Sequence, residues 1–293
     1  MLIGVDFTGS TLSAGVVEGA AVVREASVEV PAGALPGETL DALANLVRGL
    51  TKRLDAVGLA IPGQVNAQGS CWRLPNAPVF EGVPIAKEIA NRLDCPVAVE
   101  NRATAAALAE RLFGYGKTFP SFILITLGTG VGGGLVIGHQ LYPGANGFGA
   151  EIGHLCVDGA RDAPLCACGR RGCLEVFAGA RGVLRRFAEY GGLGLKLSQV
   201  VSSARRGESA GLQTVDALGV VLGRAISALQ NLLDLNGVVL AGPLASVFEL
   251  FESRLRAELR SSAFAPLLGE VPIVVSTLGE QASVVGAAYL ATL

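Results

Sequence analysis

The chain has 293 residues, of which 51% are hydrophobic and 16% are charged, so it can bury a large core and form two domains. Its formal net charge of −2, without a long basic stripe, excludes the electrostatic footprint of a nucleic-acid-binding protein. No apolar run reaches the ~20 residues that span a bilayer, and the first residues lack the basic flank of a signal peptide, so we expect a cytoplasmic protein with no membrane partner.

The apolar pattern predicts an α/β fold with two sets of elements. The first set is expected to contain strands at residues 2–5, 13–17, 21–30, 56–61 and 97–99 and helices at 39–54, 84–93 and 103–113. The second set is expected to contain strands at 122–127, 134–137, near 140, 237–240 and 272–275 and helices at 210–235, 247–259 and 281–292. The similar order of elements in the two sets indicates an internal duplication. We place the domain boundary near residue 115, which gives a first domain at 1–115 that also holds the C-terminal helix 281–293, and a second domain at 116–280.

One histidine and three clustered cysteines form the most specific motif of the second domain. Cys166, Cys168 and Cys173 lie close together, and His154 is one of only 2 histidines in the chain. One nitrogen and three sulfur ligands close a tetrahedral structural zinc site and leave no position open for chemistry at the metal. The alternative, ordinary buried thiols, is disfavoured by the spacing. The other cysteines are scattered, which fits a reducing compartment better than a disulfide framework, and Cys156 is expected to be a packed thiol.

Two glutamates flank the metal ligands. Glu151 precedes His154 by three residues, and Glu175 follows Cys173 by two. A loop fixed by a metal would hold these carboxylates in place, and carboxylates accept hydrogen bonds from the paired hydroxyls of a polyol. Taken alone, each glutamate is better explained as a solvated surface residue, and only the attachment to a rigid loop makes a binding role equally good.

Two turns have the composition of phosphate-binding loops. The first lies between the first two predicted strands and contains Asp6, Thr8, Gly9, Ser10 and Thr11. Its carboxylate and hydroxyls could hold a magnesium ion through water and donate to phosphate oxygens, although a polar β-turn has the same composition. The second turn opens the second set of strands and contains Gly128, Thr129, Gly130, Gly132 and Gly133. Glycines there allow backbone N–H groups to approach an anion closely.

Further motifs are spread along the chain: Ile61-Pro62-Gly63, Leu74-Pro75-Asn76, Glu100-Asn101 and Leu278-Gly279-Glu280-Gln281-Ala282. Together with the two turns and the combination of Glu-x-Gly-His with Cys-x-Cys-Gly-x-x-Gly-Cys, they resemble the ROK family of bacterial sugar kinases and related transcriptional repressors over nearly the whole chain. The resemblance implies an actin-like (ribonuclease-H-like) ATPase fold, with two α/β domains and a cleft between them that holds ATP and a hexose.

The resemblance also implies roles for individual residues. Sugar hydroxyls would be bound by five residues: Asn76, Asn101, Glu151, His154 and Glu175. His154 would in addition be a zinc ligand. The Asp6 turn and the Gly128–Gly134 loop would hold the ATP phosphates and magnesium, and Gly242 would lie against the adenosine. A homodimer is expected from the family.

The sequence departs from the family at its most consequential position. The family's general base is the aspartate of an Asn-Asp pair, and this chain reads Asn101-Arg102. A guanidinium stays protonated and cannot accept a proton from a sugar hydroxyl. We expect Arg102 to pair with Glu151 or Glu175, or to recruit an anionic ligand. On the nucleotide side, Thr8 stands where the family has glycine, and Ala241 and Pro243 flank the retained Gly242.

Two functions therefore remain open. The first is a ROK-type hexokinase, impaired by the loss of its base. The second is a catalytically inactive homologue that binds a sugar or a sugar phosphate and acts as a regulator. A DNA-binding repressor is disfavoured because repressors of the family carry a helix-turn-helix domain before the kinase-like fold, whereas the first strand is predicted to start at Leu2.

Overall fold

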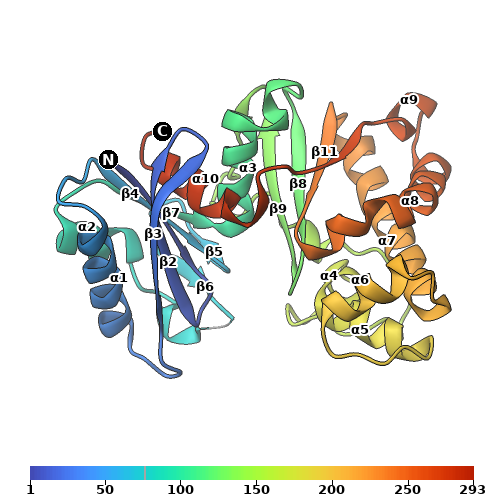
Figure 1. Ribbon diagram of the computed structural model, residues 1–293. Helices are drawn as coiled ribbons and strands as arrows, with labels where there is room; N and C mark the ends of the chain where they lie inside the picture. Colours follow the sequence, from blue (N-terminus) through green and yellow to red (C-terminus); the bar gives the residue numbers. More distant parts are fainter. Residues whose placement is uncertain (76) are drawn as a thin grey trace. The chain divides into compact units, whose positions relative to one another are not determined.

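The computed structural model describes residues 1–75 and 77–293 (Figure 1). It divides into two compact units. Unit 1 consists of Met1–Pro120, Gly134–Ala150 and Thr277–Leu293, and unit 2 consists of Ser121–Gly133 and Glu151–Ser276. The predicted boundary near residue 115 lies close to the end of the first segment. Residues 134–150, which the sequence analysis placed in the second domain, group with unit 1.

Unit 1 is built on a five-stranded sheet with the order β3-β2-β1-β4-β7. Its strands are β1 (Leu2–Phe7), β2 (Thr11–Glu18), β3 (Ala21–Glu29), β4 (Ala56–Ile61) and β7 (Val97–Asn101). A small hairpin pairs β5 (Gln64–Val65) with β6 (Cys71–Arg73). The helices are α1 (Pro36–Leu50), α2 (Ile85–Leu93), α3 (Arg102–Phe113) and α10 (Ala282–Leu290).

Alternation along β1 separates a core face from a functional face. Ile3, Val5 and Phe7 are buried in one cluster with Leu43 and Val47 of α1. The intervening residues of β1 point to the opposite face, because successive side chains of a strand alternate. Figure 1 shows α1 and α10 on different sides of this sheet.

Three glycines let α10 lie directly on that opposite face. Gly15, Gly4 and Gly58 are neighbours across β2, β1 and β4. A Cβ on Gly4 would lie 1.8 Å from the carbonyl oxygen of Val284, and a Cβ on Gly58 would lie 1.6 Å from that of Ala287. Side chains at these positions would therefore push α10 off the sheet. We call the three residues the glycine row.

The contact between α3 and α10 depends on a further glycine. A Cβ on Gly286 would lie 1.7 Å from the carbonyl oxygen of Ala105. We expect Gly286→Ala to lower the free energy of unfolding by about 2 kcal/mol or more, because overpacking of this kind typically costs about 1–3 kcal/mol. Gly49→Ala is the matched control, since Gly49 also lies in a helix but has nothing within 4 Å of the added Cβ. Gly49→Ala should leave the free energy of unfolding unchanged or raise it, and chemical denaturation measures this. Equal stabilities of the two variants would contradict the close packing of α10.

The second sheet has the order β10-β9-β8-β11-β12. Its strands are β8 (Phe122–Leu127), β9 (Val131–Ile137), β10 (Gln140–Leu141), β11 (Gly237–Ala241) and β12 (Ile273–Val275). In both sheets an antiparallel hairpin lies at one end of the order and two successive parallel pairs lie at the other. The two sheets thus share one topology, as the repeated element order predicted.

Unit 2 contains most of the remaining helices: α4 (Glu175–Ala178), α5 (Ala180–Glu189), α6 (Leu197–Arg205), α7 (Ser209–Leu233), α8 (Phe248–Ser262) and α9 (Pro266–Gly269). By length and composition α7 could cross a membrane, but half of its apolar stretch is buried within the protein. It packs against α6 and α8, which is the environment of a core helix.

Several predicted bounds were wrong in detail. The helix predicted at 39–54 runs over Pro36–Leu50, because proline suits a first helical position and Thr51 is already extended. The helices α5 and α6 were not predicted. The segment around them contains several glycines, and α5 has no side-chain hydrogen bond at its N-cap to mark its start.

Candidate functional site

The edge of the first sheet brings Asp6 and Arg102 together. Strands β1, β4 and β7 are parallel, so their carboxyl ends meet at one edge. Asp6 lies near the end of β1, and Arg102 is the first residue of α3, directly after β7. Arg102 Nη2 donates to Asp6 Oδ2 at 2.7 Å. Ser283 Oγ of α10 donates to the same oxygen at 3.1 Å.

The sequence analysis expected Arg102 to pair with Glu151 or Glu175, or to recruit an anionic ligand, and did not name Asp6, its partner within unit 1. Asp6 is only 7% exposed, so its carboxylate is largely desolvated and needs a donor close by. Arg102 supplies one from the adjacent strand end. Ser283 was not predicted as a site residue, although it directly follows the Leu278–Ala282 motif, which could have drawn attention to it.

Asn101 is fixed by hydrogen bonds at both ends of its amide. As the N-cap of α3 it accepts a hydrogen bond from the Ala103 N–H at 2.8 Å through Oδ1. Its Nδ2 donates to the Gly63 carbonyl oxygen at 2.9 Å. Asn101 therefore ties the predicted Ile61-Pro62-Gly63 motif to the start of α3. Asn76, the other predicted sugar-binding amide, lies outside the described residues.

The first predicted phosphate turn is organised by its own hydroxyl. Thr8 Oγ1 accepts hydrogen bonds from the N–H of Thr11 at 3.0 Å and of Ser10 at 3.4 Å. Gly9 has a φ of 99°, which L side chains rarely adopt, so the turn requires its glycine. The Thr8 side chain thus takes part in the turn.

The second predicted phosphate turn is held by side chains of unit 2. Thr126 Oγ1 accepts a hydrogen bond from the Gly132 N–H at 3.1 Å, and Glu175 Oε2 accepts one from the Val131 N–H at 3.2 Å. A Cβ on Gly130 would lie 2.5 Å from the same Glu175 oxygen. Glu175, predicted to bind sugar, therefore supports the glycine loop through at least one of its oxygens.

The predicted adenosine position lies next to this loop. Gly242 has a φ of 90°, and a Cβ there would lie 2.6 Å from the Leu127 carbonyl oxygen. Pro243 Cδ would lie 3.7 Å from a Cβ on Gly128. Within unit 2 the structure thus brings the predicted phosphate and adenosine segments side by side.

The four predicted zinc ligands converge. One possible ligand atom from each of His154, Cys166, Cys168 and Cys173 lies within 4.8 Å of the other three. The Cys166 sulfur lies 3.6 Å from His154 Nδ1. The Cys168 sulfur lies 3.6 Å from the Cys173 sulfur. Ligands about 2.0–2.3 Å from a tetrahedral zinc are separated by similar distances, so this cluster could hold a zinc ion. Cys156, predicted to be packed, is instead exposed, and its thiol donates to the Asp158 carbonyl oxygen at 3.4 Å.

The thiols of this cluster differ in acidity. Burial raises the pKa of Cys173 to about 12. Burial also acts to raise the pKa of Cys168, but hydrogen bonds from the backbone and side chain of Arg170 outweigh it and lower the value to about 6. Thiolates are the form that binds a metal, and the lowered pKa of Cys168 favours this form.

His154 connects this cluster to Glu151. Its Nδ1 faces the thiols, while its Nε2 lies 4.0 Å from Glu151 Oε2. A carboxylate beside the second nitrogen of a metal-binding histidine is a common way to orient the ring. Both predicted roles of His154 are thus compatible with its position, with one nitrogen directed to the cluster and the other to the predicted sugar-binding carboxylate.

Ala150, directly before Glu151, has a strained backbone. Its φ is 61°, a left-handed conformation that costs a residue with a Cβ about 1–2 kcal/mol. We expect Ala150→Gly to raise the free energy of unfolding by up to about 1 kcal/mol, the strain relieved being partly offset by the chain entropy of glycine. The neighbouring Gly149→Ala should lower the free energy of unfolding, since its Cβ would lie 2.8 Å from the Pro143 backbone. Thermal unfolding checks both changes, and a destabilised Ala150→Gly would contradict the strain.

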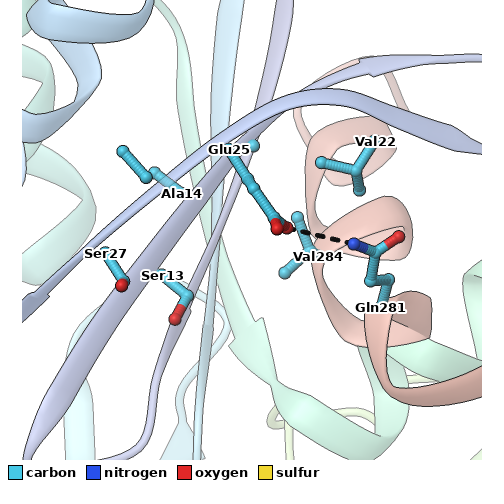
Figure 2. Close-up of a pocket in the computed structure, with 9 residues that line it drawn as sticks. Ser13, Ala14, Val22, Glu25, Ser27, Gln281 and Val284 are labelled. Atoms are coloured by element: carbon cyan, nitrogen blue, oxygen red, sulfur yellow. Dashed lines mark hydrogen bonds between the residues drawn. The ribbon is translucent and has the colours of Figure 1, made fainter.

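A cavity of about 360 Å³ lies beside the Asp6 network in unit 1. Its polar lining comes from Ser13, Ser27, Glu25 and Gln281 (Figure 2). Ser13 pairs with Asp6 across β1 and β2, so the cavity opens next to that carboxylate on the same face of the sheet. Glu25 is turned away to Gln281, whose Nε2 donates to it at 3.1 Å (Figure 2).

The family of the chain follows from comparison with known proteins. The model of the ROK family matches residues 2–293. The chain belongs to the ROK family. One relative of this ROK protein is a glucokinase of Thermotoga maritima, which is 31% identical over 99% of this chain and 96% of its own length. Another is an N-acetyl-D-glucosamine kinase of Vibrio cholerae, which is 30% identical over 88% of this chain and 89% of its own length.

Solved structures identify the fold of this ROK protein. The crystal structure of a ROK family glucokinase from Streptomyces griseus in complex with glucose and AMPPNP is 29% identical, with a TM-score of 0.84 over 99% of both chains. A ROK hexokinase from Thermus thermophilus is 28% identical, with a TM-score of 0.82 over 98% of this chain and 96% of its own. The predicted fold class, a two-domain α/β fold of the actin-like ATPase type, is confirmed.

Proposed function

We propose that this protein is a ROK-type sugar kinase that transfers phosphate from ATP to a hexose such as glucose, and that this transfer is strongly impaired. Its relatives support the class of reaction, since they include a glucokinase and an N-acetyl-D-glucosamine kinase. The observation that carries the impairment is the contact of Arg102 Nη2 with Asp6 Oδ2 at 2.7 Å.

Arg102 affects two steps of such a reaction. By resemblance it occupies the position of the family's general base, and a guanidinium cannot accept the proton of the sugar hydroxyl. Loss of a positioned base typically lowers a rate by about 10²–10⁴-fold. Arg102 also occupies the carboxylate of the turn that, by resemblance, holds phosphate and magnesium. Because phosphoryl transfer depends mainly on positioning and electrostatics, a slow residual reaction is expected.

The sugar-binding residues support binding of a neutral hexose. Asn101 is rigidly placed by its contacts with Gly63 and Ala103. Glu151 lies beside His154. We propose that the Cys166 cluster holds a structural zinc ion that keeps His154 in place.

The same ion pair also favours a second function. If no transfer remains, the protein is a catalytically inactive regulator that binds a sugar or a sugar phosphate. A regulator of this kind could tolerate the neutralisation of Asp6 by Arg102, because it has no need of the carboxylate for catalysis.

A coupled assay of ATP turnover against a panel of hexoses tests the proposal. We expect hexose-dependent turnover at least about a hundredfold below that of an active ROK glucokinase, the lower end of a general-base contribution. Calorimetry with glucose, glucose 6-phosphate and gluconate measures binding separately, and we expect glucose to bind. Ordinary turnover would overturn the impairment. Measurable binding without any turnover would select the regulator.

A further inference from the structure

The Asp6 carboxylate already has a cationic partner. Arg102 and Ser283 both donate to Oδ2. In the described part of the chain the other oxygen, Oδ1, is buried and has no hydrogen-bond partner. One negative charge and one positive charge thus lie in direct contact, and together they are neutral.

This arrangement does not fit a magnesium ion. Magnesium prefers a carboxylate that is free to face it and an octahedral shell of oxygen ligands at about 2.0–2.1 Å. At Asp6 one oxygen is committed to a guanidinium, which would also repel a divalent cation placed beside it. Only Oδ1 remains.

Two other acidic groups on this face accept hydrogen bonds from their own neighbours. Glu25 accepts a hydrogen bond from Gln281 across the neighbouring cavity (Figure 2). Glu100, on β7, accepts one from the N–H of Asn101 at 2.7 Å. Within the turn itself, residues 6–11, Asp6 is the one carboxylate, and Arg102 balances its charge.

The guanidinium keeps donors for a second partner. Arg102 has five N–H groups, and its side chain is 42% exposed. A guanidinium with unused donors binds phosphate through charge-assisted hydrogen bonds, and it can do so while it is paired with a carboxylate.

We propose that Arg102 is the resident cation of the Asp6 turn and that ATP binds to this protein without a divalent metal. The inference rests on the nucleotide binding proposed above. Arg102 replaces the charge that magnesium would bring to the phosphates, while Asp6 holds the guanidinium in position. The protein therefore recognises free ATP, which carries no metal.

The experiment is calorimetric titration of ATP into the zinc-containing protein, without hexose, in the presence and absence of Mg²⁺. Metal is removed from buffers and nucleotide with a chelating resin, because added EDTA would compete for zinc. For the wild type we expect the two dissociation constants to agree within about threefold. An affinity that falls about tenfold or more without Mg²⁺, or no binding at all without it, overturns the proposal.

Two variants assign the effect to Arg102. Arg102→Gln should weaken metal-free ATP binding about tenfold or more, since a hydrogen bond to a charged group is lost, and added Mg²⁺ should restore part of the affinity. Arg111→Gln is the matched control, because Arg111 lies on the same helix but donates to the His139 carbonyl oxygen. Unchanged metal-free binding in Arg102→Gln overturns the assignment. The comparison of wild-type ATP affinity with and without Mg²⁺ does not depend on whether a variant folds.

These outcomes are separate from those of the kinase assay. Ordinary hexose turnover would overturn the proposed impairment without deciding how ATP binds. A strict requirement for Mg²⁺ in ATP binding would overturn the resident cation even if turnover were as low as proposed.

Discussion

Arg102→Asp is expected to raise hexose-dependent ATP turnover by roughly 10²-fold or more, within the 10²–10⁴-fold range of a general-base contribution. The change restores a carboxylate at the position where the family has its base. It also releases Asp6 from its ion pair and leaves the hydrogen bond from Ser283 Oγ to its Oδ2. The measurement is kcat with a hexose under saturating ATP and Mg²⁺, beside glucose affinity from calorimetry.

Arg102→Asn is the control for this gain. It removes the positive charge from Asp6 but supplies no base, so it should recover little of the rate. If Arg102→Asp folds and binds glucose yet shows no increase in kcat, the missing base is not what limits the reaction. The inactive regulator would then be the better description.

Cys168→Ser is expected to lower the zinc content from about one ion per chain to near zero and to destabilise unit 2 by several kcal/mol. Structural zinc in a Cys3His site contributes binding free energy on the order of 10 kcal/mol, and removal of one thiolate loses a large part of it. Metal analysis of the purified protein and its chemical denaturation measure the two effects.

Cys156→Ser provides the matched control for the zinc site. Cys156 lies in the same loop region and forms a β-bridge with Cys173, but it is exposed and is not one of the four converging residues. Its replacement should leave zinc content and stability unchanged. Zinc retained at full content in Cys168→Ser, or its absence from the wild type, would refute the assigned ligand set.

The sequence predicted the convergence of His154 with the three cysteines, and most of the strands, because these signals are local. Cysteines close together in one loop readily converge on one another and on a histidine nearby in the sequence. Buried strands appear as continuous apolar runs. The partner of Arg102 was missed because it depends on topology. Asp6 is 96 residues away in sequence, and only the parallel order of β1, β4 and β7 brings it to the start of α3.

Other details depended on packing that no local pattern encodes. Glu175 was predicted from its position beside Cys173, but its contact with the Val131 N–H depends on how the glycine loop folds back. Ser283 reaches Asp6 because α10 lies on the glycine row, and that closeness involves residues from both ends of the chain. The start of α5 had no capping side chain to indicate it.

The glycine row also fixes when unit 1 can be completed during synthesis. Gly4 leaves the ribosome long before its contact Val284, because the two residues are far apart in the sequence. Until α10 has been made, the face of β1 that carries Asp6 lacks its cover, and Ser283 is not available to the carboxylate. Unit 2 lies almost wholly between these two segments and can assemble first. The final step is then a long-range closure, which is slow because distant parts of the chain must meet before the contact is made.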